Sequence, residues 1–248
     1  TKGEILLSEE AERPHNRPYV KAVSDGKGRM HFIATDGHPR NEPTNSVYHF
    51  YYEGGKFFRM DGTQIGTLDS LPIRPKDCDV VFDGKSENER AWVWDLALKE
   101  DGSPVAVYAR LPQENRHVYR YASWNGFRWV DREITSGGGW FPETPDGKRE
   151  PEPHYSGGVV LDHNNPSTVF LSRPIDGRFQ IERWRTVDGG ETWETRQVTN
   201  SASNNVRPVV ARGQWAGGSV VMWMSNRKYI HYVNYDSKIQ SAVFRGSN

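Results

Sequence analysis

Arginine, histidine and tyrosine recur in short polar segments along this chain of 248 residues. A guanidinium group is a planar fork that stays charged and binds a carboxylate or sulfate bidentately. Several such groups that meet in one place would therefore hold an anionic ligand. We expect these segments to be loops that face one end of the fold. They are His15-Asn16-Arg17, Thr35 to Arg40 (with His38 and Arg40), Glu89-Arg90, Tyr108-Ala109-Arg110, Glu152 to Tyr155 (with His154), Leu171 to Pro174 (with Arg173), Asn204 to Arg207 (with Asn205) and Met224 to Arg227.

Aromatic residues lie close to the same polar segments. Trp94, Trp140 and Tyr155 would suit stacking against sugar rings, because the C–H faces of a sugar are apolar while its edges need polar partners. A ligand that satisfies both the guanidinium groups and the aromatic rings is an acidic sugar.

Composition excludes several classes of protein. The 32 basic residues balance the 32 acidic residues, so the chain lacks the overall positive charge of a nucleic-acid binder or of a protein that binds anionic membranes. No apolar run approaches the roughly 18 residues that a membrane span needs. The single Cys78 allows no disulfide within the chain and predicts a small buried side chain. The first residue, Thr1, fits a processed protein or a piece of a longer one, and we expect a secreted or periplasmic location.

Short apolar runs with β-type periodicity must position the polar segments. Runs such as Tyr19 to Val23, Met30 to Ala34 and Pro104 to Tyr108 are separated by turns rich in Asp and Gly, and no stretch holds a helical period for long. The histidines inside such runs or in tight turns, which include His31 and His49, are expected to be packing or surface residues. We predict an all-β chain.

The runs also group into a repeating unit of roughly 45 to 55 residues, the spacing of radial sheet repeats. We predict a β-propeller of four-stranded antiparallel blades within residues 1–248. Four blades are visible, near residues 13–70, 88–136, 150–200 and 203–246, and residues 1–12 would form the outer strand of a preceding blade. Since propellers close with four to eight blades, we expect the C-terminal part of a larger, seven-bladed propeller, with the missing blades as a second segment.

The hairpin pattern from Thr186 to Trp193 is the most specific motif in the chain. It matches the Asp-box of sialidase-type propellers, in which the aspartate closes the turn, the glycines take positive φ and the tryptophan packs between blades. Residues 123–129 are a degenerate copy. We therefore interpret Asp188 as a turn residue and not as a catalytic acid.

With the Asp-box, the segments from His15 to Lys21, Thr35 to Arg40 and Glu152 to Gly158 resemble the BNR-repeat family, which includes propeller-type ulvan lyases and rhamnose–glucuronate-cleaving enzymes. The resemblance implies a seven-bladed propeller that acts on uronate polysaccharides, with a histidine pair, a tyrosine and an arginine at the axis. By position, these would be His15 and His38, Tyr108, and either Arg110 or Arg120. The remaining substrate-binding candidates are Arg17, Arg40, His154, Tyr155, Arg173, Asn205 and Arg207.

Such a set suits β-elimination at a uronate. Removal of the C5 proton requires that the carboxylate charge be neutralised, and we assign this role to Arg110 with His38. Tyr108 with His15 would serve as base and acid. Hydrolysis of a glycosidic bond instead uses two carboxylic acids, and few acids occupy the polar segments.

Two alternatives remain open. A glycoside hydrolase on an acidic glycan, rhamnosidase-like or sialidase-like, would use Arg17, Arg173 and Arg207 with Tyr155 and Glu152. A propeller could also bind carbohydrate without cleaving it. We assign no cofactor: His15, His38 and His154 are candidates for a structural divalent metal, but their spacing matches no metal-binding pattern.

Overall fold

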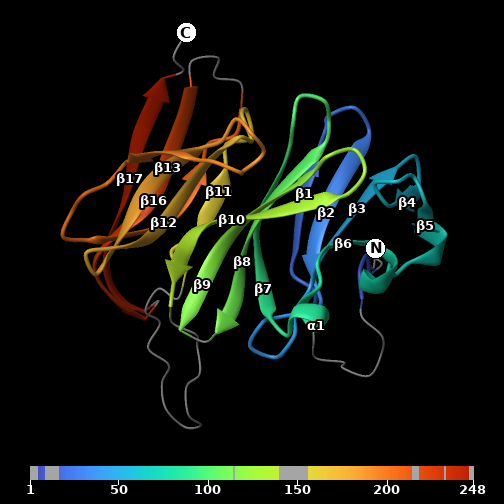
Figure 1. Ribbon diagram of the computed structural model, residues 1–248, viewed down its shortest axis with the longest axis horizontal. Helices are drawn as coiled ribbons and strands as arrows, with labels where there is room; N and C mark the ends of the chain where they lie inside the picture. The colour runs from blue at the N-terminus through green and yellow to red at the C-terminus, as the bar shows by residue number, and fades with distance from the viewer. Residues whose placement is uncertain are drawn as a thin grey trace. The chain divides into compact units, whose positions relative to one another are not determined.

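A computed structural model describes residues 5–8, 17–113, 115–139, 156–213, 218–231 and 233–245. Nearly all regular structure in these ranges is antiparallel β-sheet, so the prediction of an all-β chain is confirmed (Figure 1). The chain divides into two compact units. Unit 1 comprises Thr1–Arg110 and Ala122–Asp131, and unit 2 comprises Leu111–Tyr121 and Arg132–Asn248.

The first sheet belongs to unit 1 and has six strands. They are β1 (Val20–Ser24), β2 (Arg29–Thr35), β3 (Val47–Glu53), β4 (Lys56–Phe58), β5 (Gln64–Thr67) and β6 (Asp79–Phe82). Two short strands share the outer edge of β3, because β4 pairs with Tyr51–Glu53 and β6 pairs with the opposite end, Val47–His49. This division of one edge explains why the sheet exceeds the four strands predicted for a blade.

Two helical turns lie between β5 and β6 within the first sheet, and a third leads from β6 to the second sheet. They are η1 (Leu68–Ser70), η2 (Pro75–Asp77) and α1 (Gly84–Glu87). Of residues 1–12, the structure describes 5–8. There, Leu7 forms a parallel bridge with Ile73 and enters the core cluster of Phe32, Phe50 and Phe57, so this segment packs with the first sheet.

The second sheet has the strand order β10-β9-β8-β7 and contributes residues to both units. Its strands are β7 (Arg90–Leu98), β8 (Pro104–Gln113), β9 (Arg116–Trp124) and β10 (Trp129–Gly138). Our expectation that Tyr108 to Arg110 form a loop is wrong, because β8 continues to Gln113. The reason is that the apolar alternation extends through buried Leu111.

Unit 2 holds two further sheets. The first has the order β11-β12-β13-β14, and the second has the order β15-β16-β17. Their strands are β11 (Val159–Leu161), β12 (Thr168–Ile175), β13 (Arg178–Arg185), β14 (Glu194–Gln197), β15 (Asn204–Val210), β16 (Gly218–His231) and β17 (Asn234–Arg245). Residues 171–174, 204–207 and 224–227 are therefore parts of strands and not the loops that we expected.

The turn between β13 and β14 has the geometry predicted for Asp188. The Asp188 carboxylate accepts hydrogen bonds from the Thr192 amide (2.9 Å) and from the Thr186 hydroxyl (2.8 Å). These donors lower the pKa of Asp188. Gly189 and Gly190 have φ of +73° and +93°, and the Trp193 ring packs 5.4 Å from that of Tyr121. The structural role predicted for Asp188 is confirmed.

Cys78 is buried as predicted, and burial raises the pKa of its thiol to about 12. In the part of the chain that the structure describes, no helix is long and apolar enough to cross a membrane.

Candidate functional site

Asn45 connects two segments at one end of unit 1, the loop after β2 and the start of β7, through hydrogen bonds. Its side chain donates to the carbonyl groups of Gly37 (3.0 Å) and Ala91 (2.7 Å) and accepts from the Gly37 amide (3.0 Å). Its own amide donates to the Glu89 carbonyl (3.1 Å). Asn45 is fully buried, so the loop after β2 and the residues that enter β7 are held in a fixed relation.

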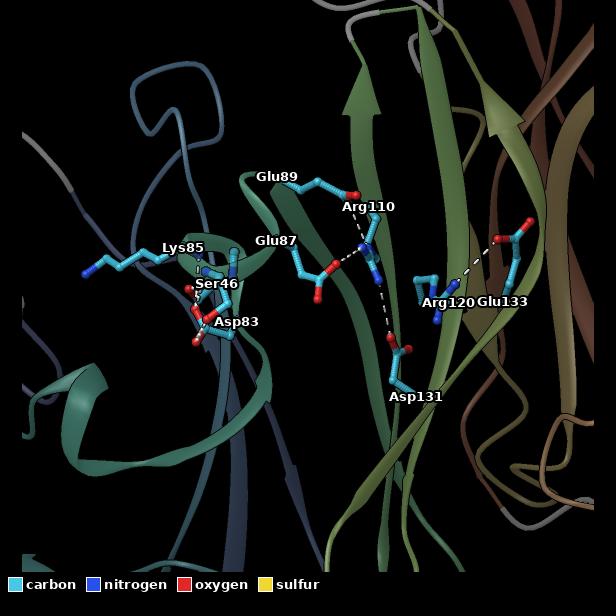
Figure 2. Close-up of polar contacts among 11 residues, drawn as sticks. Ser46, Asp83, Lys85, Glu87, Glu89, Arg110, Arg120, Asp131 and Glu133 are labelled. Carbon is cyan, nitrogen blue, oxygen red and sulfur yellow. Dashed lines mark hydrogen bonds and ion pairs between the residues drawn. The ribbon is translucent and has the colours of Figure 1, made fainter.

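Asp36 and Ser46 reinforce this connection. The buried Asp36 carboxylate accepts from the Ser46 amide (2.7 Å) and from the Tyr48 hydroxyl (2.9 Å). The Ser46 hydroxyl in turn accepts from the Gly84 amide (3.0 Å) at the start of α1 (Figure 2). Asp36, which stood in a polar segment of the sequence, thus has a structural role.

An aromatic group of Tyr19, His38 and Trp92 lies at this end of unit 1. The His38 ring is 5.4 Å from that of Tyr19 and 4.8 Å from that of Trp92, with edge-to-face geometry in both pairs. Backbone bonding between Tyr19 and Thr35 brings the start of β1 beside the end of β2. Tyr19 is 41% exposed, and the other two rings are half-buried, so the group forms part of the surface.

The tautomer of His38 follows from its hydrogen bond. The backbone amide of Arg40 donates to His38 Nδ1 at 3.0 Å, so this nitrogen must carry a lone pair. A neutral imidazole with a lone pair on Nδ1 has its proton on Nε2. His38 is therefore arranged to donate a hydrogen bond from Nε2, which suits a carboxylate oxygen.

Arg110 is the centre of an ion-pair cluster with Glu87, Glu89 and Asp131 (Figure 2). Its Nε donates to Glu89 at 2.7 Å, and its terminal nitrogens lie 3.4 Å from Glu87 and 4.0 Å from Asp131. Although burial alone would lower the pKa of Arg110, the hydrogen bond and charge of Glu89 raise it. Because Asn45 bonds the Glu89 backbone, Arg110 is tied to the same network that positions His38.

Tyr108 lies on the same face of β8 as Arg110, but in the core. Its side chain is 0% exposed, and its ring packs 6.1 Å from that of Phe82. The Arg110 guanidinium lies 4.4 Å from the centroid of the same Phe82 ring. The structure thus brings Tyr108 and Arg110 together, and it places the Tyr108 side chain away from the surface that a polymer can reach.

Among the residues that the structure describes, four predicted substrate-binding residues belong to unit 2. Arg173 binds Glu182 bidentately, at 2.7 and 3.1 Å. The buried Asn205 side chain donates to Gln180 and Ser201 and accepts from Trp223 Nε1, which is a structural set of partners. These three bonds occupy its amide, so binding of a ligand there would break them.

Arg120 and Arg207 are the other two. Arg120 lies 3.5 Å from Glu133. Arg207 sits at a β-bulge in β15, with φ of +57° and its amide bonded to the Gly157 carbonyl at 2.6 Å. A positive φ is unusual for a long side chain and re-aims it relative to its strand neighbours.

The remaining predicted residues divide by their place in the chain. Arg17 and Arg40 are exposed at the end of unit 1 that carries the aromatic group. His15, His154, Tyr155 and Trp140 lie outside the described residues. Among the described residues, no group of three or more His, Cys, Asp or Glu could hold a metal ion.

Unit 1 also contains a buried chain of ionisable groups, Asp79, His49 and His31. His49 lies 3.5 Å from Asp79 and 3.1 Å from His31, and neither imidazole is exposed. Burial lowers the pKa of His49, and it lowers that of His31 to about 3. Both histidines are packing residues, as the sequence predicted.

Sequence reasoning missed Asn45, Tyr19 and Trp92, whereas it placed Glu89 in one of the polar segments. Tyr19 and Trp92 lie just after such segments, and Trp92 alternates with Trp94 on a strand, which was a usable signal. Asn45 gave no signal, because its role comes from contacts between loops that are distant in sequence.

Comparison with known proteins decides the family. The BNR repeat-containing family matches residues 2–136, which is more than half of the chain. The chain belongs to the BNR repeat-containing family. No curated protein sequence matches this family member at a significant level.

Solved structures show a similar fold. A polysaccharide lyase, an ulvan lyase bound to -[GlcA(1-4)Rha3S]-, is similar over 93% of this chain and 52% of its own, with a TM-score of 0.60 and 13% identity. A levansucrase of B. megaterium matches 91% of this chain and 66% of its own, with a TM-score of 0.44 and 12% identity. A subtype N11 neuraminidase-like protein of A/flat-faced bat/Peru/033/2010 (H18N11) matches 91% of this chain and 58% of its own, with a TM-score of 0.42 and 11% identity. The predicted membership of a BNR-repeat family is confirmed, and the fold is similar to that of the ulvan lyase, of which the chain spans about half the length.

Proposed function

We propose that this BNR-repeat chain is part of a carbohydrate-active enzyme that cleaves a uronate-containing polysaccharide by β-elimination, and that the aromatic group in unit 1 is its active site. The observation that carries the proposal is His38, whose Nδ1 accepts the Arg40 amide so that Nε2 presents a proton beside two exposed or half-buried rings. Membership of the family and the glucuronate in the ligand of the similar ulvan lyase support the class of substrate.

The aromatic group offers both kinds of contact that an acidic sugar needs. The rings of Trp92 and Tyr19 would stack against the apolar faces of sugar rings. The His38 Nε2–H would bond the uronate carboxylate, and the exposed guanidinium groups of Arg17 and Arg40 would add positive charge nearby.

The reaction needs one proton acceptor and one proton donor. A base removes the C5 proton, the electron pair forms the C4=C5 double bond, the C4–O bond breaks, and the leaving oxygen takes a proton. A hydrogen bond from His38 to the carboxylate stabilises the charge that develops as the C5 proton leaves. No water is consumed, so the new chain end is an unsaturated uronate.

We assign the phenol of this reaction to Tyr19. Tyr19 is 41% exposed and contacts His38, whereas Tyr108 is buried in the core. His15 remains our prediction for the second acid–base residue, since it precedes Tyr19 by only four positions. Arg110, already paired with Glu89, acts in this proposal as a support for the loop that carries Glu89 and not as the neutraliser.

Glycoside hydrolysis is the second candidate. It is favoured by the side chains of Glu89 and Asp131, which are 16% and 18% exposed and both face Arg110 (Figure 2). A pair of carboxyl groups is what hydrolysis requires. Their pairing with one arginine favours a structural role, because the Arg110 guanidinium already occupies both carboxylates.

The test is to incubate the chain with a panel of glucuronate-, galacturonate- and neutral polysaccharides and to measure ultraviolet absorbance and new reducing ends together. β-Elimination gives both signals in equal molar amounts, since each cleavage creates one conjugated double bond and one reducing end. Reducing ends without absorbance would establish hydrolysis. Binding without either signal would show a carbohydrate-binding protein and overturn the proposal.

A secreted or periplasmic location belongs to the same proposal, because a long polysaccharide is met outside the cytoplasm. The test is the compartment in which the native protein is found after cell fractionation.

A further inference from the structure

Two arginines of unit 2 face each other directly across a pair of strands. In the register of β13 and β14, Arg183 is opposite Arg196. Side chains opposite each other in an antiparallel pair have Cβ atoms about 5 Å apart, and like charges at such positions destabilise the sheet. The arrangement therefore needs a compensating interaction.

Phe244 of β17 underlies both guanidinium groups. The Arg183 guanidinium lies 5.7 Å from the centroid of the Phe244 ring, and that of Arg196 lies 5.8 Å from it. The ring itself is fixed, since it packs 5.3 Å from the ring of buried Phe170. Contact with an aromatic face attracts and orients a cation, but it does not neutralise the charge.

The guanidinium groups of Arg183 and Arg196 form no ion pair and no hydrogen bond with the residues that the structure describes. Other arginines of unit 2 are paired: Arg173 with Glu182, and Arg132 with Glu191. The nearest acid in the register on the same face of the two strands, Glu194, is opposite a third arginine, Arg185. The patch keeps a net positive charge.

We propose that Arg183 and Arg196 form a second binding site in this chain, for the sulfate or carboxylate group of an acidic polysaccharide. Arg196 is exposed and Arg183 is half-buried, so an oxyanion can approach from solvent. The Phe244 ring orients both guanidinium groups. Two guanidinium groups bind one oxyanion through several charge-assisted hydrogen bonds. The ligand neutralises the cross-strand repulsion.

An isolated patch on a chain of zero net charge fits one anionic group on a polymer better than a continuous polyanion track such as nucleic acid, which needs many basic residues in a row. The site lies in unit 2 and uses no residue of the proposed cleavage site in unit 1. Failure of cleavage would therefore leave this binding site intact, and loss of this binding would leave cleavage of short oligosaccharides intact.

The test measures retardation of the whole chain by dextran sulfate, polygalacturonate and neutral dextran in affinity electrophoresis. We expect R183Q/R196Q to lose roughly tenfold or more in affinity for the anionic polymer that retards the wild type. The control R178Q/K238Q removes two positive charges from the same unit and should keep wild-type affinity. R183K/R196K keeps the positive charge without the planar guanidinium groups and should bind with intermediate affinity.

Several outcomes would overturn the site. These are equal losses in R183Q/R196Q and in the control, no retardation of the wild type by either anionic polymer, and retardation by neutral dextran as well. Sodium sulfate stabilises folded proteins in general by exclusion from their surface, so it should raise the Tm of the wild type by more than that of R183Q/R196Q. A larger rise in the wild type without polymer binding would contradict a polysaccharide ligand. Should the double variant fail to fold, R196Q at the exposed position provides the same comparison.

Discussion

His38 and Tyr108 show how surroundings decide what a polar ring can do. Both were predicted as catalytic residues, and both lie in unit 1. His38 is half-buried, with its tautomer set by the Arg40 amide, whereas Tyr108 is 0% exposed and packs on Phe82. We therefore propose His38, and not Tyr108, for contact with a ligand.

Replacement of His38 tests this difference at a single residue. We expect H38Q to lower kcat/KM by roughly 100-fold or more, because the carboxylate loses its charge-stabilising partner in the transition state. The Tm should change little, since the ring is half-buried at the surface. H163Q, a half-buried histidine of unit 2, is the control and should keep wild-type activity. Equal activity in H38Q and H163Q would contradict the assignment.

The buried histidines predict how stability depends on pH. The pKa of His31 is lowered from 6.5 to about 3 in the folded chain, so the unfolded chain binds more protons between these values. The free energy of unfolding therefore falls as pH drops below 6.5, by about 1.4 kcal/mol per pH unit for this group. His49, whose pKa is lowered too, adds to the same trend.

Denaturant unfolding at pH 7, 6, 5 and about 4.5 measures this dependence. H31Q does not titrate and should show a slope with pH that is shallower than that of the wild type by about 1 kcal/mol per pH unit. Identical slopes for the two proteins would show that His31 is not buried in its neutral form.

At the scale of elements, the loops of the candidate site are held by side chains and not by their own propensities. Asn45 makes three side-chain hydrogen bonds to the loop after β2 and to β7. We expect N45A to lower the free energy of unfolding by about 3 kcal/mol, because it leaves buried backbone groups unpaired. Activity should fall further than stability explains, since the loop that carries His38 is released.

N41A, on the same loop, is the matched control for N45A. The side chain of Asn41 is exposed, so this variant should keep wild-type stability and activity. Equal stability of N45A and N41A in urea unfolding would disprove the role of Asn45 as a connection between the loops.

Strand periodicity predicted the all-β class and the turn role of Asp188, because alternating apolar residues and an Asp-Gly-Gly turn are local signals. The limits of the strands were harder to predict. Polar residues such as Arg110 and Arg173 read as loops, but in the structure they lie in strands with their charges paired to Glu89 and Glu182. Sequence alone does not show a partner that is distant along the chain.

The same reason explains which part of the candidate site was predicted. His38 and Arg40 occupy a loop between two clear strands, so their exposure followed from local pattern. Tyr19 and Trp92 join His38 only through the pairing of β1 with β2 and the connection made by Asn45. Non-local pairing of this kind has no signature in a single sequence.

At the scale of the whole molecule, the balanced charge predicts how cleavage responds to salt. With 32 basic and 32 acidic residues, the chain has no overall field that attracts a polyanion, and attraction comes from local arginines. We expect kcat/KM on an acidic polysaccharide to fall several-fold from low salt to about 1 M, where charges are screened beyond about 3 Å. Measurement with a short uronate oligosaccharide should show a smaller fall. A rate that is independent of salt for both would contradict a role for exposed arginines.

We propose the surface of Tyr19, His38 and Trp92 as the active site, and a matched pair of phenol variants distinguishes this surface from the core around Tyr108. Y19F and Y108F each remove one hydroxyl, and the initial rate of ultraviolet absorbance on a glucuronate polysaccharide measures the outcome. We predict that Y19F loses roughly 100-fold or more of its turnover with an unchanged Tm, while Y108F keeps turnover. Full activity in Y19F together with loss of activity in a folded Y108F would contradict the claim.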